Sequence, residues 1–174
     1  LFFFSEQPPW WSTDAHRALD PRGETFHGPS PTPKRINCTH QFPFTGQFSG
    51  ASFNSQAFFC RDPQKQHRRH SFVSNLCASH DFVGIQETHS TPGRERAFDG
   101  IPGVKSFWSH GDRRSKGVAL FVKHAFLDQF SEQIWVPPEE LEPGRIGCLR
   151  LNGEKGCLDI WVIYFSATEH NERS

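Results

Sequence analysis

Apolar residues gather into short runs separated by turn formers from about residue 50 onward, and this pattern predicts a packed α/β domain. Residues 51–57 predict a first strand. Residues 64–79 predict a helix, because their apolar residues recur at i, i+1, i+4 and i+5 and so share one face. The residues on that face are Phe72, Val73, Leu76 and Cys77. The opposite face carries Lys65, Arg68 and Arg69, and we expect it to be solvated.

Further apolar runs predict the other strands. Residues 82–85 and 118–122 are continuous apolar runs of the kind that buried strands contain. Residues 146–151 and 158–165 predict two more strands, joined by a hairpin connection over residues 152–156. Both alternating sets of side chains in the last strand are apolar, so we expect it to be central and covered on both faces. The pattern predicts a sheet of about five strands with at least one helix on a face.

The first 47 residues have a different composition. They hold more than half of the chain's 13 prolines. Because proline removes a backbone donor and fixes φ, neither a helix nor a strand can run for long there. We therefore expect a Pro-rich disordered lead-in over residues 1–47 and a folded domain over residues 48–174.

Charge and cysteine usage limit the class of protein. The 19 basic and 19 acidic residues cancel, so no global positive field attracts polyanions and any phosphate contact must be local. The apolar opening at residues 1–4 is far shorter than the ~20 residues of a membrane span, so we expect no membrane contact. The five cysteines form no CxxC pair, which favours a reducing, intracellular location, nuclear or cytoplasmic. A chain that begins with Leu and contains no Met is expected to be a piece of a longer product.

Three polar residues at predicted strands could carry chemistry. Glu87 directly follows the apolar run 82–85, so its carboxylate would lie at the sheet rim, where a Mg²⁺ ion could use it. Asn54 lies within the predicted strand 51–57, and Tyr164 lies near the end of the last strand. Taken singly, each has an ordinary alternative: a solvated turn for Glu87 and Asn54, and an amphipathic core residue for Tyr164. The sequence contains no GxSxG, HExxH or P-loop motif.

The order of several strings along the chain is more informative than any one residue. In this order, they resemble the endonuclease/exonuclease/phosphatase superfamily, and most of all the apurinic-type endonuclease domain of non-LTR retrotransposons. The strings are SFNSQ at 52–56, DFVGIQETH at 81–89, KGVALFVK at 116–123, GRI at 144–146 and LDIWVIY at 158–164.

The resemblance covers about residues 50–168 and implies an α/β fold, the N-terminal half of a DNase-I-like two-sheet α/β sandwich. It implies that Asn54 orients the catalytic carboxylate and the phosphate, that Glu87 binds the metal, and that Tyr164 contacts the scissile phosphate. Gln56 is implied as a neighbour of the site. The implied cofactor is Mg²⁺ or Mn²⁺, and the implied partner is a DNA phosphodiester substrate, held by weak local contacts.

The chain also departs from the family pattern. The family's later Gly-Asp-Phe-Asn segment and C-terminal Asp-His pair have no counterpart after Tyr164, and the usual Gly-Gly is reduced to Gly117. We therefore expect a truncated Mg²⁺-dependent endonuclease domain that is inactive alone and whose full-length protein adds the missing C-terminal half or a reverse transcriptase. The alternatives are a non-catalytic remnant or weak nucleic-acid-binding module, or a superfamily member that acts on a phospholipid or RNA. We also expect half a sandwich to leave an apolar sheet face uncovered, with residues such as Val118, Leu120, Ile160 and Val162.

Overall fold

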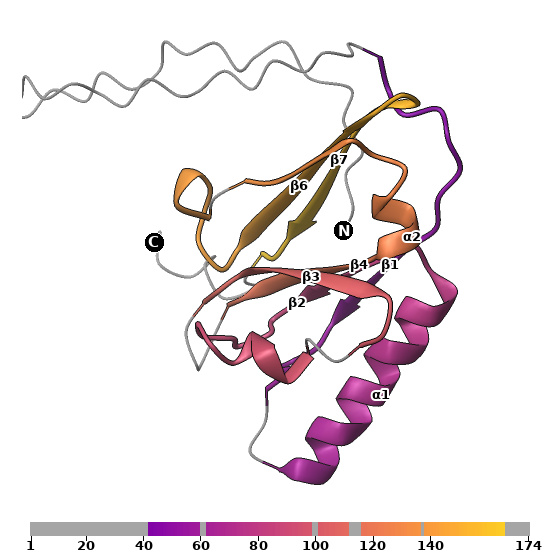
Figure 1. Cartoon of the computed structure of the whole chain (residues 1–174). Helices are drawn as coiled ribbons and strands as arrows, with labels where there is room; N and C mark the ends of the chain where they lie inside the picture. The colour runs from indigo at the N-terminus through magenta and orange to yellow at the C-terminus, as the bar shows by residue number, and fades with distance from the viewer. Residues whose placement is uncertain (1–41, 60–61, 99–100, 112–115, 137, 166–174) are drawn as a thin grey trace, which may run out of the picture.

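The computed structural model describes residues 42–59, 62–98, 101–111, 116–136 and 138–165 of the 174-residue chain. These residues form two β-sheets stacked face to face, and one long helix covers the outer side of the larger sheet (Figure 1). The larger sheet has the strand order β1-β2-β4-β3, and the smaller has the order β5-β6-β7. The predicted two-sheet α/β sandwich is confirmed. Residues 1–41 of the expected disordered lead-in lie outside the described residues.

The larger sheet is built around strand β2, which pairs in parallel with β1 and antiparallel with β4. Its strands are β1 (Gly50–Asn54), β2 (Phe82–Gln86), β3 (Val104–Ser109) and β4 (Val118–Lys123). Strand β4 is buried on both faces: Leu120 packs toward the smaller sheet, and Phe121 packs toward the helix. This double burial explains the continuous apolar run of the sequence.

The smaller sheet is an antiparallel meander that contains the predicted hairpin. Its strands are β5 (Glu132–Trp135), β6 (Ile146–Gly153) and β7 (Gly156–Ile163). The β6–β7 register runs from Ile146 opposite Ile163 to Gly153 opposite Gly156, so Glu154 forms the turn with its neighbour Lys155. The short helical elements are η1 (Glu95–Phe98), α2 (His124–Leu127) and η2 (Pro138–Glu140).

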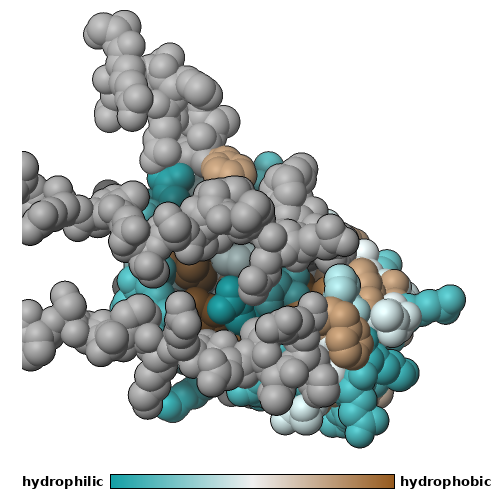
Figure 2. Space-filling model, turned by 90° about the horizontal axis from the view of Figure 1, so that it is seen from above, coloured by the Kyte–Doolittle hydropathy of each residue, from teal (hydrophilic) through white to brown (hydrophobic). Residues whose placement is uncertain are grey.

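Strands β3 and β5 were not predicted from the sequence, and β7 is placed differently from the prediction. The segments VKSFWS and EQIW mix polar and apolar residues without a clear period, which hides the two strands. Within the described residues, β7 lies at the edge of its sheet and is not central. Its outward side chains Trp161 and Ile163 are half-buried. In the view from above, the coloured part of the surface mixes hydrophilic and hydrophobic residues (Figure 2).

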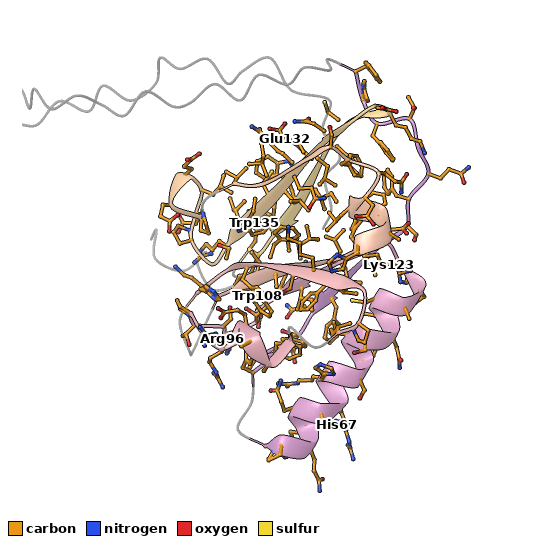
Figure 3. All side chains as sticks on the ribbon, viewed as in Figure 1. His67, Arg96, Trp108, Lys123, Glu132 and Trp135 are labelled. Carbon is orange, nitrogen blue, oxygen red and sulfur yellow. The ribbon has the colours of Figure 1, made fainter. Side chains whose placement is uncertain are left out.

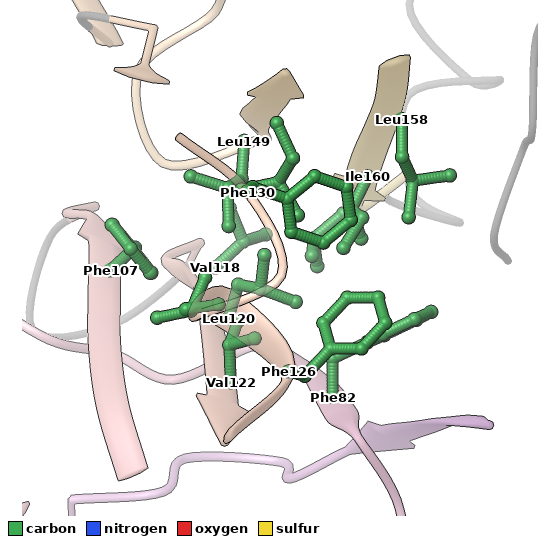
Figure 4. Close-up of a cluster of buried hydrophobic side chains, with 13 residues drawn as sticks. Phe82, Phe107, Val118, Leu120, Val122, Phe126, Phe130, Leu149, Leu158 and Ile160 are labelled. Atoms are coloured by element: carbon green, nitrogen blue, oxygen red, sulfur yellow. The ribbon is translucent and has the colours of Figure 1, made fainter. Parts of the chain in front are cut away.

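The space between the two sheets is the main hydrophobic core (Figure 4). The residues expected on an uncovered face are buried there, each at 1% exposure or less: Val118, Leu120, Ile160 and Val162. That expectation was wrong because the two sheets of this segment cover each other. Phe126 and Phe130, in and after α2, close one end of the core.

A second core joins the larger sheet to helix α1 (Pro63–Ser79), which confirms the predicted helix. Asp62 accepts hydrogen bonds from the first turn and caps the helix, and Val73 and Cys77 are its buried residues. Burial raises the pKa of the Cys77 thiol to about 11, so this cysteine is an apolar packing residue. Arg69, expected on a solvated face, is half-buried and donates a hydrogen bond to the carbonyl of Ala57. No helix in the described part of the chain is long and apolar enough to cross a membrane.

The folded unit begins earlier than residue 48. Pro43 forms a parallel bridge with Cys157 of β7, and the Phe44 backbone N–H donates to the Cys157 carbonyl at 2.9 Å. The Phe44 ring packs on Phe130 with a centroid distance of 5.0 Å. Residues 42–47, which were expected in the disordered lead-in, therefore contact the sandwich through backbone hydrogen bonds and through the Phe44 side chain, which packs against the core.

Loss of side-chain volume between the sheets should destabilise the fold. Leu149 is 0% exposed in this core, so we expect Leu149→Ala to lower the free energy of unfolding by about 2–5 kcal/mol. Phe165→Ala, at a side chain that is 77% exposed, should change it by less than about 0.5 kcal/mol. Urea unfolding followed by tryptophan fluorescence measures both. Equal losses would contradict the assigned packing.

Candidate functional site

The candidate residues lie at one end of the sandwich because several strands begin or end there. Asn54 is the last residue of β1 and lies opposite Gln86, the last residue of β2. Gln86 in turn lies opposite Val118, the first residue of β4. Glu87 therefore follows β2 at the edge where β1 ends and β4 begins.

Asn54 and Glu87 are in direct contact. Asn54 Nδ2 donates a hydrogen bond of 2.9 Å to Glu87 Oε1. The other polar atom of the amide, Asn54 Oδ1, accepts a 3.1 Å hydrogen bond from the Gln56 backbone N–H. No hydrogen bond or ion pair from the described residues reaches Glu87 Oε2. The amide is fixed at both of its polar atoms, and the carboxylate is held with one oxygen available to a ligand.

The backbone beside this pair adopts left-handed conformations without glycine. The φ angles are 45° at Gln56, 73° at Ala57, 52° at Glu87 and 52° at His89. Each such residue costs on the order of 1–3 kcal/mol, so surrounding contacts must hold it. One contact is the Ala57 backbone N–H, which donates to the Glu87 carbonyl at 2.9 Å. The left-handed turn also explains why β1 ends at Asn54 although the apolar pattern predicted a strand to residue 57.

Gly117 fixes the loop that carries Glu87. The Thr88 backbone N–H donates to the Gly117 carbonyl at 2.9 Å. Gly117 has a φ of +92°, and a Cβ there would lie 2.3 Å from Thr88 Oγ1. Glycine is required at this position for both its φ angle and the close approach.

The same end of the molecule includes Tyr164 on the smaller sheet. The Gly117 backbone N–H donates to the Gly144 carbonyl at 2.7 Å, and the Tyr164 backbone N–H donates to the Arg145 carbonyl at 2.8 Å. Tyr164 is half-buried against the inter-sheet core. The structure thus brings Asn54 and Glu87 into contact. It places Tyr164 at the same end, through backbone hydrogen bonds that involve the residues directly before β4 and β6.

A buried polar network supports the Glu87 loop, and sequence analysis missed it. Thr88 Oγ1 donates to Ser90 Oγ at 2.9 Å, and both side chains are fully buried. Ser90 Oγ lies 3.1 Å from His110 Nδ1, and His110 Nε2 lies 3.8 Å from Glu95. Burial lowers the pKa of His110, although the nearby Glu95 carboxylate opposes this shift.

The network lies between β3 and η1. The His110 ring stacks on Trp108 with the ring planes 9° apart. Figure 3 labels Trp108 on β3 and Arg96 on the short helix η1, which also carries Glu95. No sequence signal marks this group, because its members lie on separate elements.

The donor set at Glu87 suits a hard divalent cation. Among the described residues, no group of three or more His, Cys, Asp or Glu side chains could hold a metal ion. Structural zinc sites need four such ligands and catalytic zinc sites need three, so the residues present do not fit zinc. Mg²⁺ and Mn²⁺ fit better, because Mg²⁺ is bound through one or two carboxylates, several waters and substrate phosphate oxygens.

The solved structures that are similar to this chain include the following two. The crystal structure of AP endonuclease LMAP from Leishmania major has a TM-score of 0.53 and 13% sequence identity, over 72% of this chain and 45% of that chain. The crystal structure of truncated Caenorhabditis elegans TDP2 has a TM-score of 0.42 and 17% identity, over 71% of this chain and 48% of that chain. The fold is DNase-I-like.

The likeness to AP endonuclease LMAP shows the fold alone, because the sequence identity is low. The chain spans about half the length of the structures that it matches. No protein-family model matches the sequence, and no curated protein matches it either.

A side chain at Gly117 should disturb the Glu87 loop. Gly103→Ala is the matched control, since Gly103 has a φ of +72° and nothing lies within 4 Å of its Cβ position. Gly103→Ala should cost about 1–2 kcal/mol of unfolding free energy from the left-handed backbone. Gly117→Ala should cost about 1–3 kcal/mol more, from overpacking against Thr88. Equal losses in urea unfolding would contradict the close approach.

Acid should weaken the fold through His110. Its pKa is lowered in the folded state, so the unfolded chain binds the proton first as the pH falls. The stability is complete above the unfolded pKa of about 6.5. It should fall as the pH drops from there toward the folded pKa, by at most about 1.4 kcal/mol per pH unit for one proton. Unfolding free energies between pH 7.5 and 5 should therefore fall more steeply for the wild type than for His110→Gln. Parallel curves would contradict this role.

Proposed function

We propose that this chain is half of a phosphodiesterase domain that uses Mg²⁺ or Mn²⁺ and acts on DNA, of the type found in non-LTR retrotransposons. The observation that carries the proposal is the 2.9 Å hydrogen bond from Asn54 Nδ2 to Glu87 Oε1 at the strand ends. The proposal also has support from the DFVGIQETH string at residues 81–89. A further support is the DNase-I-like fold shared with a protein described as an AP endonuclease.

The chain's own residues would bind and orient. Glu87 would bind the cation through Oε2, because Oε1 is occupied by the Asn54 amide. Asn54 would keep the carboxylate in one orientation, and its own rotation is blocked by the hydrogen bond from Gln56. Tyr164, at the same end on the other sheet, would donate its phenol O–H to a phosphate oxygen. The cation would supply neutralisation of charge on the phosphate.

After Tyr164 the sequence has no counterpart of the Gly-Asp-Phe-Asn segment or the Asp-His pair that the family resemblance leads us to expect. No second carboxylate or histidine among the described residues forms a hydrogen bond or ion pair with Glu87. General-base catalysis by such groups is worth typically about 10²–10⁴-fold. We therefore propose that the 174-residue chain binds metal without appreciable nuclease activity, and that the missing C-terminal half or a reverse transcriptase accompanies it in the full-length protein. With DNA as substrate, the proposed location is intracellular, nuclear or cytoplasmic.

Metal binding by the full 174-residue chain tests the proposal. We expect Mn²⁺ to bind in calorimetric titration, and Glu87→Gln to abolish binding, because the amide keeps the shape but loses the charge. Asn54→Ala should weaken Mn²⁺ binding roughly 10–100-fold, the usual cost of removing a partner that orients a ligand. Glu154→Gln, in the exposed β6–β7 turn, is the matched control and should bind as the wild type does.

DNA assays separate the alternatives. Under the proposal, plasmid DNA in Mg²⁺ is not nicked in a Glu87-dependent manner by the 174-residue chain. Robust nicking that disappears in Glu87→Gln would show that the catalytic set is complete. DNA binding that weakens steeply with salt and persists in Glu87→Gln, without Mn²⁺ binding, would instead indicate a non-catalytic nucleic-acid-binding module. Mn²⁺-dependent binding of RNA or phosphoinositide but not DNA would contradict the proposed substrate.

A further inference from the structure

The turn after β1 depends on contacts from outside the turn. Gln56 and Ala57 are consecutive residues with φ angles of 45° and 73°, and neither is glycine. Two adjacent left-handed residues of this kind are uncommon, because the Cβ atom crowds the backbone. The turn also presents two successive carbonyl groups, those of Gln56 and Ala57, to hydrogen-bond donors from outside the turn.

Helix α1 supplies both donors from one side chain. Arg69 Nη1 donates to the Ala57 carbonyl, and Arg69 Nη2 donates to the Gln56 carbonyl at 3.3 Å. The planar guanidinium group suits two neighbouring acceptors, which a lysine ammonium group does not match. Since α1 is packed on the larger sheet through Val73 and Cys77, the position of Arg69 is fixed relative to the strand ends.

The contacts continue from this turn to the candidate site. The Gln56 backbone N–H donates to Asn54 Oδ1, and Asn54 Nδ2 donates to Glu87 Oε1. The Ala57 backbone N–H donates to the Glu87 carbonyl. Both left-handed residues thus hold the Asn54–Glu87 pair through their backbone N–H groups. Gln56 donates to the Asn54 side chain, and Ala57 donates to the Glu87 backbone.

We propose that Arg69 is a positioning residue: it holds Gln56 and Ala57 in the left-handed conformation that orients the Asn54 amide against Glu87. That this orientation serves a divalent cation rests on the proposed function. The sequence pattern predicted that Arg69 lies on a solvated face of the helix. The structure favours the positioning role, because two of the guanidinium nitrogens already bond to carbonyls of the turn.

The side-chain amide signal of Asn54 in ¹⁵N NMR spectra reports the arrangement directly. Asn54→Asp assigns the signal by its disappearance. We expect Arg69→Met, which keeps the aliphatic stem, to shift the Asn54 signal toward that of a free amide and to weaken Mn²⁺ binding about 10-fold or more. Arg68→Met is the matched control, because Arg68 is the exposed neighbour on the same helix, and it should change neither quantity.

A rescue variant separates positioning from a general loss of structure. Glycine adopts positive φ without a Cβ clash, so Ala57→Gly should restore the turn without its outside donor. We expect the double variant Arg69→Met/Ala57→Gly to recover much of the wild-type Asn54 signal and Mn²⁺ affinity. If Arg69 only docked α1 on the sheet, Ala57→Gly would restore neither the Asn54 signal nor the Mn²⁺ affinity.

Each outcome decides the proposal. An unchanged Asn54 signal in Arg69→Met overturns it, as does the absence of rescue by Ala57→Gly. If Arg69→Met does not fold, Arg69→Lys, which keeps the charge but not the planar pair of donors, should show a smaller shift of the same sign, and no shift overturns the proposal. If the wild type binds no Mn²⁺, the proposed function fails, and the Asn54 signal still decides whether Arg69 positions the pair.

Discussion

The parallel register of β1 against β2 is the constraint on which the candidate site depends. Because the pairing sets Asn54 opposite Gln86, the amide lies beside the next residue, Glu87. The register is fixed by burial, since Val83 and Ile85 of β2 face α1 while Phe82 faces the other sheet. A slip of one residue would turn these side chains to the wrong faces, so the hydrophobic cores hold the two polar residues in contact.

Backbone geometry shapes the site more than charge does. The left-handed residues at the ends of β1 and β2 store strain in the segments that carry Asn54 and Glu87. That strain persists because the rest of the sandwich supplies well-packed cores on both sides of the larger sheet. Strain at a site that is held from outside is typical of functional sites, and here Arg69 and the network of Thr88, Ser90 and His110 provide the outside contacts.

The sequence could predict what depends on local pattern. Helix α1, strands β2 and β4 and the β6–β7 hairpin follow from periodicity and turn formers, and Glu87 follows from its place after a buried run. The contact between Asn54 and Glu87 could be expected only from the resemblance, because a sequence does not show pairing between strands. Arg69 could not be assigned, since helical spacing gives the face of a residue and not its acceptor. The edge position of β7 was hidden by apolar residues on both of its faces, where Trp161 is half-buried.

The hydrogen bond to Oε1 also bears on which cation the site would select. Asn54 occupies one oxygen of Glu87, so a bound ion would meet a single carboxylate oxygen. Ca²⁺ takes roughly 6–8 oxygens and often uses a carboxylate in bidentate fashion, whereas Mg²⁺ accepts one or two carboxylate oxygens and keeps its waters. An ion that bound both oxygens would compete with the Asn54 amide for Oε1. Under the proposed function, the pair that orients the carboxylate would therefore favour a small, water-retaining cation, which leaves coordination positions for a phosphate oxygen.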